Sequence, residues 1–266
     1  MMDDIINQCD RHGRNDLIMT DSTPGARRVQ RVRHEIKRRE LQVARVVRVS
    51  PHVQRITFAG DALADFVSAS FDDHVKLILP DAATGQPAMR DYTPRRVDTV
   101  AGELDIEFAL HGDGPAATWA AQARPGDQAT VAGPRGSFVV PIDYDWHLLI
   151  GDETALPAVA RRLEELPHGA RAIVRLAVAD PADRRTLASA ATLDLQWADS
   201  DDALIATARA LTLPAGDGYA WCAAEAATAA ALRRVLVDEK GHDRHAIRAA
   251  AYWKRGAVAH HENLED

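Results

Sequence analysis

The chain has 266 residues, enough for one large or two ordinary domains, and its hydrophobic content of 46% can form a substantial core. A net charge of −7 argues against general affinity for nucleic acid, and no apolar run reaches the roughly 20 residues that span a bilayer. Cys9 and Cys222 lie far apart and no apolar N-terminal segment is present, which argues against a disulfide framework and against secretion. We therefore expect a cytoplasmic protein that binds neither nucleic acid nor membranes.

Residues 1–30 show little hydrophobic period and contain a turn at Thr23–Gly25, so we expect a flexible leader. A basic run begins within it and extends from Arg27 to Arg39. Such a run usually forms a solvated face. The alternative, a nucleic-acid-binding segment, predicts salt-dependent DNA binding and conflicts with the acidity of the whole chain.

From Leu41 onward the apolar residues recur with a period of two, which is typical of strands. This period places Leu41, Val43 and Val47 on one face of the first strand. Further runs of the same kind are separated by Gly, Pro or Asp turns and cover 54–58, 75–79, 104–110 and 129–132. The spacing predicts a small antiparallel barrel.

The segment 90–95, with the sequence RDYTPR, lies between two of these runs and is charged and aromatic. Arg90 and Arg95 offer planar cationic donors to phosphate oxygens. Tyr92 offers a face for ring stacking, and Thr93 offers a short hydrogen-bonding hydroxyl. These groups suit a flavin nucleotide, which has a flat ring at one end and a diphosphate. The alternative is a surface hairpin whose charges face water.

A second segment, 111–119, follows a strand and opens a helix, with Pro115 suited to the first helical position. Helix N-termini present free amides, so glycines here would let an anion approach the backbone. Thr118 offers a hydroxyl to the same phosphate, and Trp119 offers an aromatic surface. The alternative is an ordinary Gly-Pro turn with Trp119 in the core.

After Pro141 strands alternate with helices, which predicts an open, mainly parallel α/β sheet. The expected strands are 146–150, 172–178, 193–197, 219–223 and 246–253, and the expected helices are 156–166, 203–211 and 225–237. Ligands of such sheets bind at the carboxyl ends of the strands, here 151–154, 180–185 and 223–225. A flavin-type barrel followed by a nucleotide-type sheet predicts a flavin reductase that takes hydride from a nicotinamide.

In these segments the chain resembles the siderophore-interacting proteins, a family of FAD-dependent ferric-siderophore reductases that includes the vibriobactin-utilisation proteins. The resemblance rests on RDYTPR at 90–95, HGDGPAATWA at 111–120, GPRG at 133–136 and GDETALP at 151–157, in that order. Shorter likenesses at 31–35 and 252–256 extend it over nearly the whole chain. It implies a ferredoxin-reductase-like fold, in which an antiparallel six-stranded barrel (residues 31–143) binds FAD. An α/β domain with a mainly parallel sheet (residues 144–266) would meet NAD(P)H and the siderophore.

The resemblance also implies roles for individual residues. Tyr92 would stack on the isoalloxazine and Thr93 would hydrogen-bond near its reactive nitrogen, so these two would serve the chemistry directly. Arg90 would hold the diphosphate. The other expected cofactor contacts are His111, Gly114, Ala116, Thr118 and Trp119 on the FAD side, and Asp152, Glu153, Thr154 and Glu225 in the crevice of the sheet. An anionic substrate calls for cations beside the flavin edge, for which Lys254, Arg255 and Arg95 are the candidates; no metal-ligand set is expected.

The predicted function is therefore reduction of a ferric siderophore by electrons from NAD(P)H through FAD, with release of iron(II) in the cytoplasm. Arg184 or Arg185 would favour NADPH by binding its 2′-phosphate, unless that loop is merely exposed, so NADPH and NADH stay open. Two alternatives are a general flavin reductase or diaphorase and a siderophore-binding protein without redox activity. We expect a monomer whose partner is the ferric siderophore itself.

Overall fold

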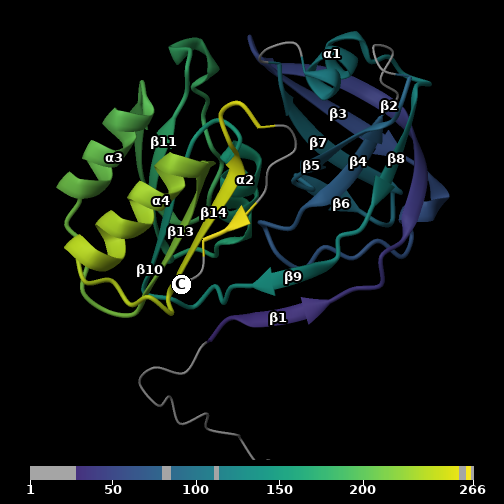
Figure 1. The fold of residues 1–266 in the computed structure, drawn as a ribbon. Coiled ribbons are helices and arrows are strands. Elements are labelled where there is room, and N and C mark those ends of the chain that lie inside the picture. Colours follow the sequence, from purple (N-terminus) through teal and green to yellow (C-terminus); the bar gives the residue numbers. More distant parts are fainter. Residues whose placement is uncertain (1–27, 80–84, 111–113, 258–261, 265–266) are drawn as a thin grey trace, which may run out of the picture.

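The computed structural model describes residues 28–79, 85–110, 114–257 and 262–264, which form two large sheets lying side by side (Figure 1). Most of the expected leader, residues 1–27, lies outside the described residues. Arg28 bonds through Nη1 to Asp217 at 2.5 Å, and Gln30 begins strand β1 (Gln30–Arg33). This strand pairs antiparallel with β9 (Gly136–Val139) and runs beneath both sheets.

The N-terminal sheet is antiparallel and curls around its own core. Its described strands are β2 (Arg38–Ser50), β3 (Val53–Ala59), β4 (Val75–Leu79), β5 (Ala88–Tyr92), β6 (Arg96–Asp98), β7 (Glu103–Ala109) and β8 (Gln128–Ala132). Their spatial order is β5-β4-β8-β2-β3-β7-β6, so the described sheet has seven strands in place of the six expected. The short helices η1 (Asp61–Leu63) and α1 (Pro115–Gln122) complete this part. Inward side chains such as Leu41, Ile56, Leu77 and Phe108 are buried in one cluster.

The alternation expected for the first strand fails halfway along β2. The pairing with β3 shifts between Val43 and Arg45, which is the mark of a β-bulge. An extra residue reverses the faces of everything that follows. Val46 consequently packs against the core, whereas Val47, expected on the inner face, is 49% exposed.

The C-terminal sheet is parallel except for its last strand. Its order is β12 (Thr192–Ala198), β11 (Arg171–Ala177), β10 (Trp146–Gly151), β13 (Gly218–Glu225), β14 (Ile247–Trp253) and β15 (Glu262–Asn263), and only β15 pairs antiparallel. Helix α2 (Leu156–Glu165) covers the face nearer the barrel; α3 (Asp201–Ala210) and α4 (Ala226–Arg234) cover the other (Figure 1). Helix α4 continues as a π-helical turn, η3 (Val235–Glu239), and η2 (Pro181–Asp183) is a single 3₁₀ turn after β11.

The strands of this sheet are apolar on both faces, as a sheet covered by helices on both sides requires. Leu149 packs with α2, whereas its neighbours Leu148 and Ile150 pack with α3 and α4. Helix α3 begins at the N-cap Ser200, whose hydroxyl accepts a hydrogen bond from the Ala203 amide at 3.1 Å. Within the described residues no helix is long and apolar enough to cross a membrane.

Candidate functional site

A cavity of about 410 Å³ lies where the barrel meets the carboxyl ends of the parallel strands. Residues from both sheets line it, so neither part of the chain forms it alone. The lining residues are Val53, Arg90, Tyr92, Glu107, Ala109, Gly114, Ala116, Ala117, Glu153, Thr154, Leu156, Pro157, Arg185 and Trp253. Seven of the residues singled out from the sequence are thus brought together here: Arg90, Tyr92, Gly114, Ala116, Glu153, Thr154 and Arg185.

Strand β5 supplies the two most informative lining residues. Arg90 and Tyr92 are two positions apart and therefore share a face of the strand. The half-buried Tyr92 ring packs against Phe108 with centroids 4.5 Å apart, which fixes its position. Burial raises the pKa of Tyr92, so its hydroxyl stays protonated. The Arg90 side chain donates a hydrogen bond to the neighbouring Met89 carbonyl at 2.8 Å.

Thr93 lies just behind this surface and does not line the cavity. It is 7% exposed, and its side chain is hydrogen-bonded with the Tyr252 hydroxyl. The structure thus places Tyr92 in the cavity and Thr93 at the seam between the barrel and strand β14.

Helix α1 presents its N-terminus to the cavity through Gly114 and Ala116. Gly114 is the N-cap residue and provides no side-chain cap, so the first amides of the helix are not satisfied by a side chain. Thr118 is exposed and lies outside the cavity lining. Trp119 is partly buried against the barrel core, stacked on Phe58 with centroids 6.2 Å apart, and does not line the cavity. His111 lies outside the described residues.

On the opposite wall, Asp152 organises the ends of three strands. It is 3% exposed, and its Oδ1 accepts from the Thr154 amide at 2.9 Å and the Thr154 hydroxyl at 2.5 Å. Its Oδ2 accepts from the Glu225 amide at 3.0 Å and from Trp253 Nε1 at 2.8 Å. Burial raises the pKa of Asp152, although these four donors oppose that effect. Asp152 therefore positions Thr154 and Trp253 and does not itself line the cavity.

Gly151 allows this packing. A Cβ at Gly151 would lie 2.4 Å from the Ala223 carbonyl oxygen and 2.3 Å from the Ala155 Cβ, distances that real side chains do not adopt. Glycine thus lets the turn after β10 lie directly against β13.

Glu225 serves as the N-cap of α4 and is 7% exposed. Its carboxylate accepts from the Ala227 amide at 2.7 Å and the Arg255 amide at 3.1 Å. Burial would raise the pKa of Glu225, but the amides of Arg255, Ala227 and Thr228 outweigh it, so the pKa is lowered. The carboxylate holds the chain after β14 in place and is not among the cavity residues.

A buried network of ion pairs borders the cavity and connects Arg185 with Glu107 and Arg55 of the barrel. Glu107 is 4% exposed and lies 2.6 Å from Arg55 and 2.5 Å from Arg185. Burial would raise the pKa of Glu107, but the arginines outweigh it and the pKa is lowered. Arg184 pairs with Asp199. The two arginines considered for a 2′-phosphate are therefore paired with carboxylates.

The three cations expected at the substrate lie elsewhere. Arg95 is 7% exposed and its guanidinium bonds Glu164 of α2 at 2.8 and 2.5 Å, so it joins the two domains and is not placed to meet a substrate. Lys254 and Arg255 are exposed at the rim after Trp253. Arg255 lies 3.9 Å from Asp201 and the described structure records no ion pair for Lys254.

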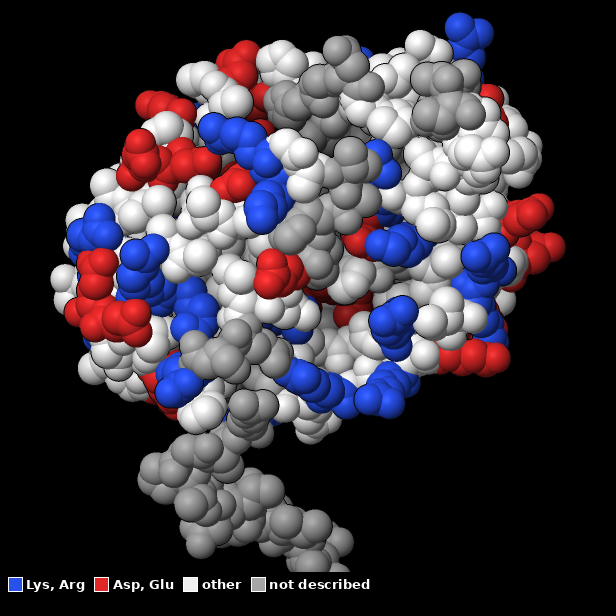
Figure 2. All heavy atoms as spheres, in the orientation of Figure 1, with Lys and Arg blue, Asp and Glu red and all other residues white. Residues whose placement is uncertain are grey.

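A basic groove, which sequence reasoning missed, runs along the seam of the two domains. Two adjoining hollows of about 760 and 420 Å³ share Ile36, His74 and Arg135. A third hollow of about 250 Å³ shares Arg31, Phe138, Arg248 and Asn263 with the larger one. The first two hollows together are here called the groove. Its cationic lining residues are Arg31, Arg33, Arg38, Lys76, Arg135 and Arg248. Figure 2 shows Lys and Arg gathered across the lower front of the molecule, where β1 and β9 run.

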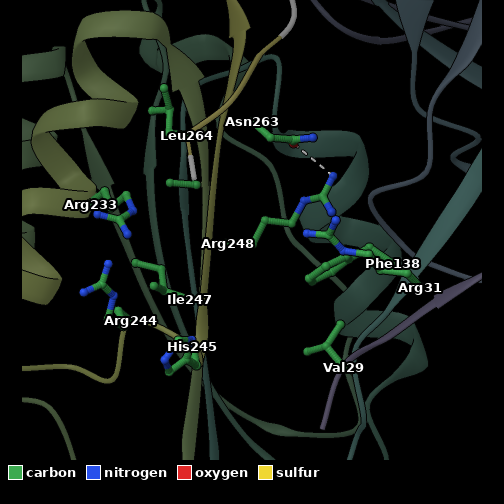
Figure 3. A pocket seen from close by; sticks show the side chains of 11 residues that line it. Val29, Arg31, Phe138, Arg233, Arg244, His245, Ile247, Arg248, Asn263 and Leu264 are labelled. Atoms are coloured by element: carbon green, nitrogen blue, oxygen red, sulfur yellow. Dashed lines mark hydrogen bonds between the residues drawn. The ribbon is translucent and has the colours of Figure 1, made fainter. Parts of the chain in front are cut away.

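Apolar side chains accompany these cations. Ile36 and Met89 line the groove and are 55% and 48% exposed. In the third hollow, Arg31 and Arg248 lie over the ring of Phe138, with Arg248 4.4 Å from its centroid (Figure 3). Arg248 also donates to Asn263 at 3.1 Å and lies 2.9 Å from the buried Asp72. The groove therefore combines positive charge with flat apolar surface.

The groove and the cavity share strand β5. Met89 and Asp91 line the groove, whereas the alternate residues Arg90 and Tyr92 line the cavity. No single motif marks the groove because its residues come from six separate segments, within 31–38, 72–78, 89–91 and 132–138 and at 248 and 263. Trp253 was also missed as a cavity residue, although it lies at the end of the last long strand and within the family likeness at 252–256.

Comparisons with known proteins match both parts of the chain. Residues 144–256 match the family model described as siderophore-interacting protein, and residues 42–88 and 82–138 match the siderophore-interacting FAD-binding domain. The chain is 39% identical over 245 residues to the NADPH-dependent ferric-chelate reductase of Escherichia coli K12, covering 84% of this chain and 96% of that one. It is 32% identical over 251 residues to the ferric vibriobactin reductase ViuB of Vibrio cholerae, covering 84% and 93%.

Solved structures support the fold. A siderophore utilization protein from T. fusca has a TM-score of 0.80 at 34% identity, covering 87% of this chain and 98% of that one. The ferredoxin reductase of carbazole 1,9a-dioxygenase has a TM-score of 0.62 at 19% identity, covering 80% and 68%, a likeness of fold alone. The expected ferredoxin-reductase-like fold is confirmed.

Proposed function

The chain belongs to the siderophore-interacting protein family, and from that premise we propose that it is an FAD-dependent reductase of ferric siderophores. Electrons would come from NADPH, and iron(II) would be released in the cytoplasm by a protein acting as a monomer. The observation that carries the proposal is the cavity shared by both domains, with a basic groove on the other face of the same strand, β5.

The cavity residues fit FAD. Tyr92 presents a held aromatic face for the isoalloxazine, and Arg90 presents a guanidinium for the diphosphate. The uncapped start of α1 at Gly114 and Ala116 adds amides for the same anion. When bound, FAD would accept the two electrons of one hydride and pass them on one at a time.

The sheet side of the cavity suits the nicotinamide. Ligands of open α/β sheets bind at the carboxyl ends of the strands, where Glu153, Thr154 and Trp253 line the cavity. Asp152 holds the indole of Trp253 and the hydroxyl of Thr154, so these two residues present fixed surfaces. Trp253 of the sheet lines the same cavity as Tyr92 of the barrel.

The groove suits the iron chelate. Many ferric siderophores are anionic and bind iron(III) through hard oxygen donors, and arginine and lysine attract such anions. Reduction weakens the complex because iron(II) has lower charge density, so electron transfer is itself the release step. The exposed Ile36 and Met89 add surface for the aryl groups of a catecholate. Lys254 and Arg255 stay predicted rim contacts.

The test is an absorption spectrum recorded without oxygen. The purified protein should be yellow, lose its colour with NADPH, and regain it with a ferric catecholate while a coloured chelator traps iron(II). A general flavin reductase would instead be reoxidised faster by free flavin or quinone than by the ferric chelate. A siderophore carrier without redox activity would not lose colour with NADPH.

A further inference from the structure

Three polar side chains form a continuous hydrogen-bonded line at the groove. Ser137 donates its hydroxyl proton to Asp73 Oδ2 at 2.7 Å, and the Oγ of Ser137 lies 2.8 Å from His34 Nε2. They come from three separate segments: the end of β1, the loop before β4, and β9. All three residues line the largest hollow of the groove.

The directions of these bonds follow from a count of hydrogens. A serine hydroxyl has one hydrogen, and here it goes to the carboxylate of Asp73. Ser137 can therefore only accept from His34, so His34 carries a proton on Nε2. Ser137 also accepts from the Ala69 amide at 3.1 Å, which completes its bonding. The hydrogen bond to Ser137 thus fixes a proton on Nε2 of His34. The other ring nitrogen, Nδ1, can exchange a proton with a ligand or solvent in the groove.

The inner end of the line is buried and well held. Asp73 is 2% and Ser137 5% exposed. Asp73 Oδ2 also accepts from the Ser68 hydroxyl at 2.9 Å and the Ser70 amide at 3.1 Å. Burial raises the pKa of Asp73, with a smaller contribution from the neighbouring Asp72, while the three donors oppose it.

The outer end is open to the groove. His34 is half-buried, and its backbone amide donates to the Arg135 carbonyl at 2.9 Å. The charged and titratable groups lining the same hollow are Arg31, Arg33, Asp72, His74, Arg135 and Arg248. Beyond Asp73, Arg161 of α2 donates to the Ser68 hydroxyl at 2.8 Å. His34 therefore lies between the buried Ser137–Asp73 pair and the open groove.

We propose that His34 is a general acid that protonates an oxygen donor of the ferric chelate as its iron is reduced, and that Ser137 and Asp73 hold it for this task. The inference rests on the proposed function. Oxygen donors become more basic when iron(III) becomes iron(II), and a proton on the donor prevents it from binding the metal again. General acid catalysis of this kind contributes about 10²–10⁴-fold in rate.

In this step the bound flavin would supply one electron to the iron, and one iron–oxygen bond of the chelate would break. The Nδ1–H bond of protonated His34 breaks, and an O–H bond forms on the released donor. Neutral His34 keeps the proton on Nε2, which still donates a hydrogen bond to Ser137 Oγ. A proton from solvent then restores Nδ1–H.

The experiment follows reoxidation of NADPH-reduced protein in anaerobic stopped flow, with two oxidants. A ferric tris-catechol chelate needs protons as it releases iron, whereas ferricyanide keeps its ligands and needs none. His34→Gln should slow reoxidation by the ferric chelate about 10²–10⁴-fold and remove its pH dependence and solvent isotope effect. Reoxidation by ferricyanide should stay as in the wild type, and calorimetry with the unreducible gallium chelate measures any loss of chelate binding separately.

Two more variants keep the proposal testable if one misfolds. His34→Ala should be slow with the ferric chelate and be rescued by added imidazole, and Ser137→Ala should be slowed in the same direction. His52→Gln is the matched control, since His52 bonds a buried carboxylate, Asp183, at 2.9 Å but does not line the groove. Its kinetics should equal the wild type.

Opposite outcomes separate the two proposals. Wild-type rates, pH profile and isotope effect in His34→Gln and His34→Ala would overturn the general acid and leave the reductase intact. Equal slowing with both oxidants would also overturn it, because the defect would then lie in electron delivery. Wild-type protein that NADPH decolours but no ferric chelate reoxidises would overturn the proposed function, and the general acid with it.

Discussion

The indole nitrogen of Trp253 donates a hydrogen bond of 2.8 Å to the carboxylate of Asp152, joining the ends of β14 and β10. The same oxygen of Asp152 accepts from the Glu225 amide at the end of β13. One buried carboxylate thus ties three strand ends together beside the cavity. The position of Trp253 depends on a side chain that does not itself line the cavity.

Asp152→Asn should therefore destabilise the fold and displace Trp253. The side-chain NH₂ group of asparagine would replace one carboxylate oxygen that now accepts two hydrogen bonds. Two buried donors would then lose their acceptor. We expect a loss of about 2–4 kcal/mol in the free energy of unfolding, measured by urea denaturation. Asp180→Asn is the control, since Asp180 accepts from the Ala182 amide at 2.9 Å in a half-exposed turn. Equal stability of the two variants would refute the role given to Asp152.

Loss of flavin should follow from changes at β5. Arg90→Ala should raise the dissociation constant for FAD about 10–100-fold, because a charged hydrogen bond to phosphate contributes about 1.5–3 kcal/mol. The measurement is fluorescence of released flavin on dilution. Arg96→Ala is a control on β6, the next strand along the chain, where the arginine pairs with Asp98, Glu103 and Asp105 and does not line the cavity.

The Tyr92 ring should matter through its face and not its hydroxyl. Tyr92→Phe keeps the contact with Phe108 and the stacking surface, so FAD should be retained. Tyr92→Ala removes both, and FAD should be lost. Retention of FAD in Tyr92→Ala would show that the isoalloxazine lies elsewhere.

Local patterns predicted most of the elements. Period-two and helical spacing located the long strands and helices, because these depend on residues close in sequence. The same patterns placed Val47 inward, since a β-bulge leaves no sign in a period of two. Trp119 and Arg95 were assigned to ligands by residue type, yet the structure pairs them with Phe58 and Glu164.

The groove lay beyond sequence reasoning for a physical reason. Arg31, Lys76, Arg135 and Arg248 come together only when β1 pairs with β9 and the two domains meet. Each looks like an ordinary surface cation in its own segment. The cavity motifs were visible because their residues lie within a few positions of one another.

The groove predicts which cations bind the substrate. Arg135→Ala should raise the apparent KM for an anionic ferric chelate about 10-fold, with the FAD content unchanged, since a charge-assisted contact contributes about 1.5 kcal/mol or more. The effect should shrink at high salt. Steady-state kinetics with NADPH in excess measures it.

The comparison is the double variant Lys254→Ala with Arg255→Ala. These exposed cations lie at the cavity rim, outside the groove, so their removal should raise KM less than Arg135→Ala does. The reverse order would place the chelate at the rim beside Trp253 and remove the groove from the substrate site.

Buried His147 should make the protein less stable in mild acid. His147 on β10 is 1% exposed, and burial, with the nearby positive charge of Arg162, lowers its pKa from 6.5 to about 4. Between these two pH values the unfolded chain binds a proton that the folded chain refuses, so stability falls as the pH decreases. Above pH 6.5 His147 is neutral in the folded and the unfolded chain, and no stability is lost through it. Below pH 4 it is protonated in both, and the loss levels off.

His147→Gln tests this directly, because glutamine can still donate to the Ile142 carbonyl, which His147 Nε2 contacts at 3.3 Å, but does not titrate. A pKa difference of this size corresponds to roughly 3 kcal/mol at full effect. Urea unfolding at pH 7.5 and pH 4.5 should therefore show a loss on acidification that is about 2–3 kcal/mol smaller in the variant. Carboxylates titrate alike in both proteins, so the difference isolates His147. If both proteins lose the same stability between these pH values, His147 is not held neutral by the fold.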